Sequence, residues 1–151
     1  MSEEQKNFSI QKVYVKDVSF ESPNAPAVFS EAEWAPEINV QLNTESHGLA
    51  DNVFEVTLKI TVTATQATKT AFLVELHQAG IFTIEGFDEE EKGGMLGSYC
   101  PNVLFPFARE AINDLVGKGG FPQLLLAPIN FDALYAQHLE KKQAPAEELT
   151  H

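Results

Sequence analysis

Cysteine is almost absent from this chain, because Cys100 is its single cysteine among 151 residues. One cysteine excludes an internal disulfide and a cysteine metal cluster, and we expect Cys100 to be a small buried hydrophobic residue. The four histidines lack the spacing of a metal site, and the glycine-rich segments do not complete a phosphate-binding loop. A Gly-x-Ser-x-Gly nucleophile turn is also missing. The sequence therefore predicts no metal, no cofactor and no enzymatic activity.

Basic residues are scarce as well. Lysine and arginine number 10 against 22 acids, which gives a formal net charge of −12. That charge argues against nucleic acid and anionic membranes as partners and favours a basic protein or peptide. The first residues, MSEEQK, do not resemble a signal peptide, and no apolar run approaches the roughly 20 residues of a membrane helix. We expect a cytoplasmic protein that does not insert into membranes.

The apolar content of 44% over 151 residues is sufficient for one domain with a sizeable core. We expect a flexible N-terminus over residues 1–7, a single domain over 8–142 and a disordered acidic tail over 143–151.

Four segments alternate in the manner of β-strands. The clearest covers residues 54–63, where apolar and polar side chains exchange places at every step. Residues 37–43 and 72–85 follow the same rule. The first segment, 8–20, is apolar at both parities, which indicates cover on two sides or pairing beyond its own chain. Because one long loop follows the first strand and short turns join the others, the pattern favours an antiparallel meander.

Helical periodicity begins near residue 101 and continues to 116, as one broad apolar stripe. Pro106 is expected to kink this helix or to mark its start. Asn130 is a good N-cap for a second helix with apolar residues at i, i+3, i+4, i+7 and i+8 from Phe131. Residues 88–97 are predicted as a loop or a short helix. The fold class is therefore α+β.

The loop over residues 19–36 is unusual because it combines three prolines with large apolar side chains. Pro23 and Pro26 disfavour both a helix and a central strand. Loops of this length are often functional. Two interpretations remain open: Phe20, Phe29 and Trp34 pack beneath the loop, or they wall an apolar groove for a molecule outside the chain.

Several stretches resemble the SecB family of bacterial protein-export chaperones. The similarity covers about residues 8–140, and the stretches that carry it are KDVSFESPNAP (16–26), AFLVE (71–75), GIF (80–82), YCPNVLFP (99–106), FPQ (121–123) and LAPINFDAL (126–134). The resemblance implies an α+β protomer. Its four-stranded antiparallel sheet has a long crossover loop after the first strand, followed by a long helix and a shorter C-terminal helix.

The resemblance also implies a function and an assembly. Such a protein is an ATP-independent holdase that binds unfolded preproteins in the cytoplasm, keeps them translocation-competent and delivers them to the SecA ATPase. It forms a homotetramer, a dimer of dimers. Two protomers pair through their first strands, and two such dimers stack through the long helix.

Two sets of site residues follow from the resemblance. The SecA-binding residues are Asp17, Glu21, Leu73 and Glu75, on an acidic sheet face that receives a basic tail. The groove for unfolded clients is lined by Phe20, Phe29, Trp34, Phe131, Leu134 and Tyr135. The zinc that such a tail carries belongs to SecA.

An enzyme or small-ligand protein whose pocket is the same aromatic loop is the alternative function. The missing nucleotide and metal motifs favour the chaperone.

Overall fold

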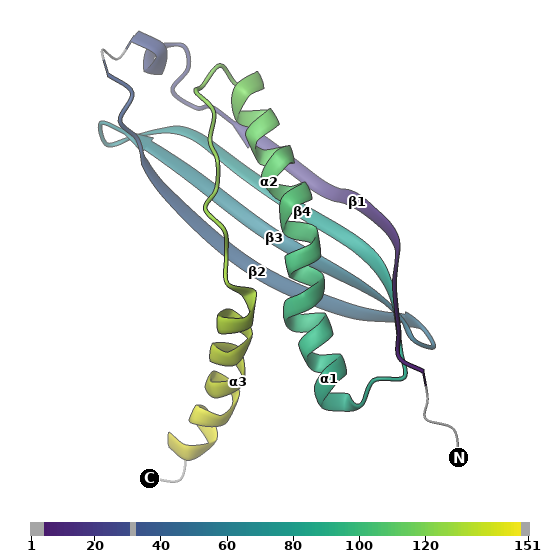
Figure 1. The fold of residues 1–151 in the computed structure, drawn as a ribbon. Coiled ribbons are helices and arrows are strands. Elements are labelled where there is room, and N and C mark those ends of the chain that lie inside the picture. Colours follow the sequence, from purple (N-terminus) through teal and green to yellow (C-terminus); the bar gives the residue numbers. More distant parts are fainter. Residues whose placement is uncertain (1–4, 31–32, 149–151) are drawn as a thin grey trace.

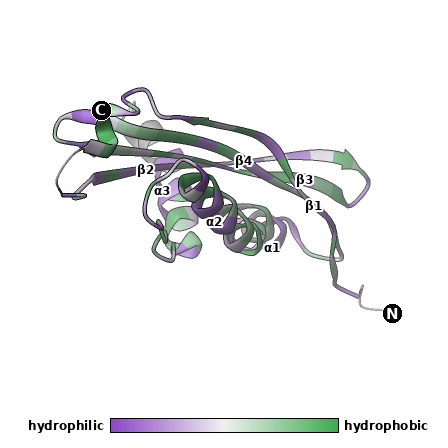
Figure 2. Cartoon of the chain, turned by 90° about the horizontal axis from the view of Figure 1, so that it is seen from above, coloured by the Kyte–Doolittle hydropathy of each residue, from purple (hydrophilic) through white to green (hydrophobic). Residues whose placement is uncertain are grey.

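The structure is a computed structural model that describes residues 5–30 and 33–148, with side chains as far as residue 142. Strands β1 (Asn7–Glu21), β2 (Glu37–Ala50), β3 (Val53–Gln66) and β4 (Lys69–Glu85) form one antiparallel sheet. Helices α1 (Glu89–Gly94), α2 (Cys100–Lys118) and α3 (Phe131–Glu148) all lie on one face of this sheet (Figures 1 and 2). The predicted α+β architecture is confirmed.

The strand order is β1-β4-β3-β2, so only β2, β3 and β4 form a meander. The first strand pairs with β4 instead of β2, and the predicted four-stranded meander is wrong in this respect. The loop after β1 therefore crosses from one edge of the sheet to the other, with a short 3₁₀ turn at Ala27–Ser30 (Figure 1). Alternation predicts that a segment is a strand, but the neighbour of a strand is decided by what its connection can span.

Two β-bulges interrupt β1 and overturn the sequence interpretation of its faces. The pairing with β4 shifts register twice, and the shifts leave Gln11 and Lys16 as extra residues. Positions of opposite parity therefore come to share a face. The helix-facing side holds all the aliphatic and phenylalanine residues of the strand: Phe8, Ile10, Val13, Val15, Val18 and Phe20. The opposite face is polar, so the predicted apolar character of both faces is wrong.

The core lies between α2 and the middle of the sheet. Its fully buried side chains include Leu58, Ile60, Phe72, Leu76, Phe82, Leu104 and Ile112. Gly80 allows α2 to approach β4 closely, because a Cβ atom there would lie 3.0 Å from Cδ2 of Leu104. Cys100 is completely buried in this core, as predicted, and burial raises the pKa of its thiol to about 12.

The helical region that includes α2 begins earlier and ends later than the sequence suggests. Residues 89–99 are helical, with a π-helical turn at Met95–Tyr99 that leads directly into α2. Pro106 lies inside α2 and does not mark its start. Asn130 caps α3 as predicted, because its Oδ1 accepts a hydrogen bond from the Ala133 amide at 3.0 Å.

The predicted termini are only partly within the described residues. Helix α3 includes residues 143–148, which the sequence assigns to a disordered tail. Of the predicted flexible N-terminus, Asn7 already belongs to β1. Residues 1–4 and 149–151 lie outside the described residues.

The packing of α2 predicts a large cost for shortening its central core residue. Leu104→Ala should lower the free energy of unfolding by about 2–5 kcal/mol, because it removes buried methyl groups and leaves a cavity. Leu125→Ala is the matched control, since that side chain is 66% exposed and should change stability by less than about 0.5 kcal/mol. Urea unfolding of both variants at one protein concentration measures the difference. Equal stability of the two variants would contradict this packing.

Candidate functional site

An aromatic cluster occupies the end of the sheet where the crossover loop passes. Phe72 of β4 is at its centre, with the Phe121 ring centroid at 5.0 Å, Phe20 at 5.9 Å and Trp34 at 6.5 Å. Phe29 packs on Phe121 at 5.1 Å. Aromatic pairs at these separations stabilise each other beyond simple area burial. The loop, the end of β1 and the segment after α2 thus meet in one apolar site.

Side-chain hydrogen bonds hold the loop on the β3–β4 end of the sheet. Ser22 Oγ donates to the Ala71 carbonyl at 2.9 Å, and Asn24 Nδ2 donates to the Thr70 carbonyl at 2.8 Å. Gln66 accepts from the Ala35 amide at 3.0 Å and donates to the Glu33 carbonyl. A proline-containing loop forms few backbone pairs, so these polar contacts fix its course.

The two interpretations of the loop, that its aromatic rings pack beneath it or that they wall an open groove, each hold for different residues. Phe20 and Trp34 are half-buried against the core, whereas Phe29 is 50% exposed. A hollow of about 160 Å³ opens beside these rings, lined by Val28, Phe29, Glu33, Trp34, Gly120, Phe121 and Pro122. Small-molecule sites usually have roughly 300–1,000 Å³. This hollow therefore suits a side chain of a polypeptide better than the cofactor-sized ligand of the alternative function.

The other predicted groove residues lie apart from this cluster, on α3. Phe131 is buried against Phe105, with ring centroids 5.8 Å apart. The Tyr135 ring lies over Gly97 and leaves no room for a Cβ atom there. Leu134 is 41% exposed and borders a hollow of about 450 Å³ between β2 and α3. Another hollow, of about 500 Å³, shares Phe131 and Tyr135 as walls.

The six predicted groove residues therefore form two sites instead of one. The segment over residues 121–130 runs from the aromatic cluster to α3 (Figure 1) and carries Leu125, which is 66% exposed. Sequence reasoning missed Phe72 and Phe121, which join the loop rings to the core. Phe72 reads as an ordinary core position of a strand. Phe121 could have been recognised from its position between Gly120 and Pro122, within an apolar connecting segment.

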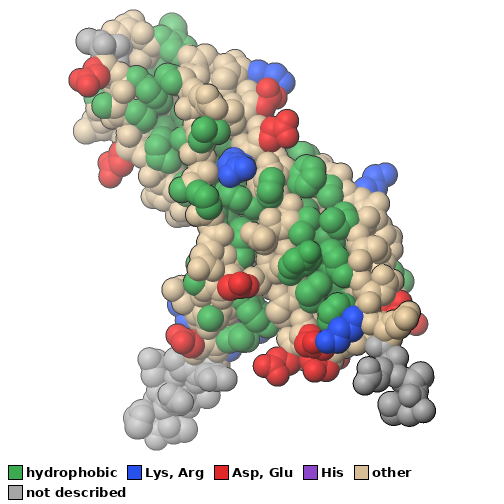
Figure 3. Space-filling model, in the orientation of Figure 1, with side chains coloured by type: hydrophobic (Ala, Val, Ile, Leu, Met, Phe, Trp, Pro, Cys, Tyr) green, Lys and Arg blue, Asp and Glu red, His purple; other side chains and the backbone are tan. Residues whose placement is uncertain are grey.

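A third apolar surface lies between β1 and α2. Phe107 is 48% exposed, as are Ile10 and Val15, and Val18 is 44% exposed. A hollow of about 560 Å³ separates the two elements here. Exposed apolar side chains on the helix-bearing face gather along α2 and around the crossover loop (Figure 3).

The apolar stripe of α2, the long helix through which the resemblance implies that dimers stack, is mostly used within the protomer. Leu104 and Ile112 are fully buried there, and so is Leu76 on β4. A substitution that introduces a charge at any of these three positions would therefore test the fold of the protomer, and not only its assembly. Exposed Phe107 is the residue of this stripe that is available to a second copy.

The predicted docking residues come together on the sheet face opposite the helices. Glu21 pairs directly with Leu73, and Glu75 lies two positions further along β4, opposite Ser19. Asp17 is the next outward residue of β1 beyond Ser19. The three carboxylates are exposed and Leu73 is half-buried. The pairing of β1 with β4 thus brings these three carboxylates together as a small acidic patch around Leu73.

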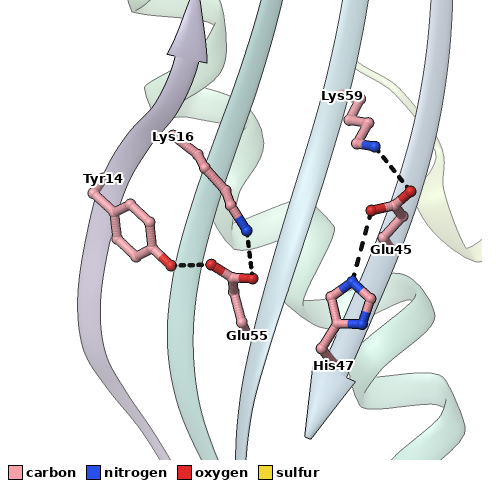
Figure 4. A network of polar contacts seen from close by, with 6 residues as sticks. All are labelled: Tyr14, Lys16, Glu45, His47, Glu55 and Lys59. Carbon is pink, nitrogen blue, oxygen red and sulfur yellow. Dashed lines mark hydrogen bonds and ion pairs between the residues drawn. The ribbon is translucent and has the colours of Figure 1, made fainter. Parts of the chain in front are cut away.

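Ion pairs distinguish the carboxylates of this acidic patch from Glu55 and Glu45 on the same face. Glu55 accepts a hydrogen bond from Lys16 at 2.8 Å, and Glu45 accepts one from Lys59 at 2.8 Å (Figure 4). These bonds lower the pKa of both carboxyl groups. Among the described residues, none of the three carboxylates of the acidic patch takes part in an ion pair or a side-chain hydrogen bond. The acidic patch therefore keeps its negative charge, which is available to a basic partner.

The described ranges, 5–30 and 33–148, contain no group of three or more His, Cys, Asp and Glu side chains that is placed to hold a metal ion. Within the same ranges, no helix has the length and apolarity to span a membrane.

The side chain of Tyr14 reaches across β4, and its hydroxyl donates a hydrogen bond to Glu55. This contact predicts that the Tyr14 hydroxyl titrates at an unusually high pH. Burial raises the pKa of Tyr14 to about 12, with the bond to Glu55 adding to the shift. The unfolded phenol titrates near pH 10, so this contribution to stability is present below pH 10 and is lost as the pH rises toward 12. Phenolate absorbance should show one of the three tyrosines ionising late, and Tyr14→Phe should remove that phase. A late phase that survives Tyr14→Phe would refute the assignment.

Comparison with known proteins gives a consistent result. A family model described as preprotein translocase subunit SecB matches residues 1–142. The protein-export protein SecB of Nitrosococcus oceani is 60% identical over 150 residues, which cover 98% of this chain and 92% of that protein. The protein-export protein SecB of Methylococcus capsulatus is 56% identical over 154 residues, which cover 99% of each.

A solved structure shares the fold. It is a SecB-like chaperone of Mycobacterium tuberculosis in complex with a peptide from an antitoxin, with a TM-score of 0.67 and 19% identity. The alignment covers 81% of this chain and 90% of that one. Together with the family model and the relatives in Nitrosococcus and Methylococcus, these findings show that the chain belongs to the SecB family of protein-export chaperones.

Proposed function

We propose that this protein is an ATP-independent holdase. It binds unfolded precursor proteins in the cytoplasm, keeps them competent for translocation and delivers them to the SecA ATPase without catalysing a reaction. The observation that carries this proposal is the difference in chemical character between the two faces of the sheet. Apolar sites open on the helix-bearing face, while an unpaired acidic patch occupies the other face. The net charge of −12 is unfavourable for nucleic acid and anionic membranes as partners.

Client binding would use the aromatic cluster at one end and the α3 site at the other. Apolar burial is non-directional and contributes roughly 25 cal/mol per Å², so such sites accept many sequences. Strand β2 is the free edge of the sheet between the two sites, and its Val40 is 40% exposed. An extended client can add main-chain hydrogen bonds along such an edge.

The exposed ring of Phe29 is the sharpest probe of client binding. Phe29→Ala should weaken the complex with a denatured polypeptide roughly tenfold, because burying the exposed half of the ring contributes about 1–2 kcal/mol. Trp34 packs in the same cluster, so its fluorescence should change when a client binds. Leu49→Ala is the control, since Leu49 is 53% exposed at the far β2–β3 turn.

Delayed refolding of the denatured polypeptide measures this holding activity. If Phe29→Ala holds clients as tightly as Leu49→Ala does, the aromatic cluster serves only packing and the client site lies elsewhere.

Delivery would use the acidic patch. Its carboxylates would attract a basic tail of SecA, which sets association rate and salt dependence, and Leu73 would provide an apolar anchor. Asp17→Asn and Glu21→Gln should each weaken SecA binding roughly two- to fivefold at low salt. Glu75→Lys should weaken it more, because it reverses the charge. Client holding by all three variants should remain near that of the parent.

Glu45→Gln provides a matched control on the same face. Its carboxylate is already bonded to Lys59, so its loss should affect SecA binding less. Calorimetric SecA titration and client holding are measured on the same preparations. An equal loss of both activities, or an effect of Glu45→Gln as large as that of Asp17→Asn, would show that the acidic patch is not the docking site.

Assembly would use the β1–α2 surface. We propose a homotetramer, a dimer of dimers, in which first strands pair and long helices stack. The half-exposed side chains of Ile10, Val15, Val18 and Phe107 support this proposal, because burying them in a second copy removes apolar area from water.

A further inference from the structure

The hollow of about 450 Å³ between β2 and α3, here called the α3 site, changes in chemical character along the helix. Its apolar lining includes Leu134 and Leu139, whose side chains are 41% and 43% exposed. One turn after His138, the same face of the helix carries Lys141 and Lys142, which are exposed and also line the hollow. The apolar lining therefore ends at two adjacent positive charges.

The charge of these two lysines is not neutralised within the hollow. Among the described residues that line it, Glu45 is the only carboxylate, and it already accepts a hydrogen bond from Lys59 at 2.8 Å. Lys141 and Lys142 form no ion pair with any residue whose side chain the structure describes. Glu140 precedes them in the sequence but does not line the hollow. The α3 site therefore offers positive charge to a bound polypeptide.

The aromatic cluster has the opposite charge. Of the described residues that line its hollow, Glu33 alone is charged, and its side chain is exposed. The two apolar sites proposed for client binding thus differ in the sign of the charge beside them.

We propose that the α3 site selects client segments in which an apolar stretch is flanked by carboxylates. The apolar stretch contacts the two exposed leucines, while neighbouring Asp or Glu side chains of the client meet Lys141 and Lys142. This inference rests on the proposed holdase function and adds a charge preference to one of its two client sites. The protein then holds acidic segments at the α3 site and leaves basic segments to the aromatic cluster.

The net charge of −12 opposes this preference, so distance decides which effect prevails. The Debye length is about 8 Å at physiological ionic strength, so exposed charges that lie farther apart are largely screened from each other. The acidic patch lies on the face of the sheet opposite α3 (Figure 2). A client carboxylate in contact with Lys141 or Lys142 is only about 3–4 Å from the ammonium group, where screening is weak. Attraction by the two lysines therefore exceeds the repulsion by distant carboxylates.

Three labelled peptides that share one apolar sequence test the preference, with flanks of Glu, of Gln or of Lys. Phe29→Ala is the common background, because it weakens the aromatic cluster as a competing site. Lys141→Gln/Lys142→Gln should weaken binding of the Glu-flanked peptide roughly fivefold to twentyfold at low salt, since an exposed ion pair contributes a factor of about two to five. The Gln-flanked peptide should change by less than about twofold. Fluorescence anisotropy measures each affinity.

Lys141→Arg/Lys142→Arg retains the charge and should restore most of the binding of the Glu-flanked peptide. Added salt should reduce the difference between the parent and the Gln double variant, because it screens exposed ion pairs. A change of less than about twofold for the Glu-flanked peptide in the Gln double variant would overturn the preference.

Lys69→Gln/Lys118→Gln is the matched control, because it removes the same charge at two exposed lysines that do not line the hollow. Its effect on the Glu-flanked peptide should stay below about twofold. An equal loss in both double variants would show that net charge acts in place of the α3 site, and would overturn the proposal. A changed sedimentation coefficient of Lys141→Gln/Lys142→Gln would assign the lysines to a contact between copies, which also overturns it.

Leu134→Ala separates a failure of this inference from a failure of the proposed function. It should weaken all three peptides alike, because it removes an apolar contact that the flanks do not share. If it does so while the Gln double variant binds the Glu-flanked peptide normally, the charge preference is overturned and the client site stands. If Leu134→Ala weakens none of the peptides, the α3 site does not hold clients, and the preference is overturned with it.

Discussion

The packing of α2 across the centre of β3 and β4 is the contact on which the other features depend. Leu104 and Ile112 are fully buried against the sheet, and Gly80 allows the helix to approach closely. One helix is narrower than four strands, so it covers the middle of one face and leaves the strand margins uncovered. The aromatic cluster, the α3 site and the β1–α2 surface all lie along these margins.

Because the helices occupy a single face, the opposite face is free to carry charge. There the lysines on β1 and β3 neutralise Glu55 and Glu45, whereas the acidic patch keeps its carboxylates unpaired. A basic partner and an apolar client would therefore meet different sides of the sheet. Because of this separation, a substitution on one face should leave the other face unchanged. Its effect can therefore be assigned to the face that carries it.

Much of the architecture could be predicted from local pattern. The alternation of apolar and polar side chains correctly predicted that β3 and β4 are strands. The capping preference of Asn130 correctly predicted where α3 begins. The groove could not be predicted as a shape, because Phe121 and Phe72 approach each other only after α2 has packed.

The sequence by itself determined the α+β class, the burial of Cys100 and the two-sided character of the central strands. Each of these follows from periodicity or composition within a short window. Only the tertiary structure decided that β1 pairs with β4 and that two bulges collect its apolar residues on one face. A bulge is an insertion relative to a partner strand. Its position therefore cannot be known from one strand alone, before the partner and the register are fixed.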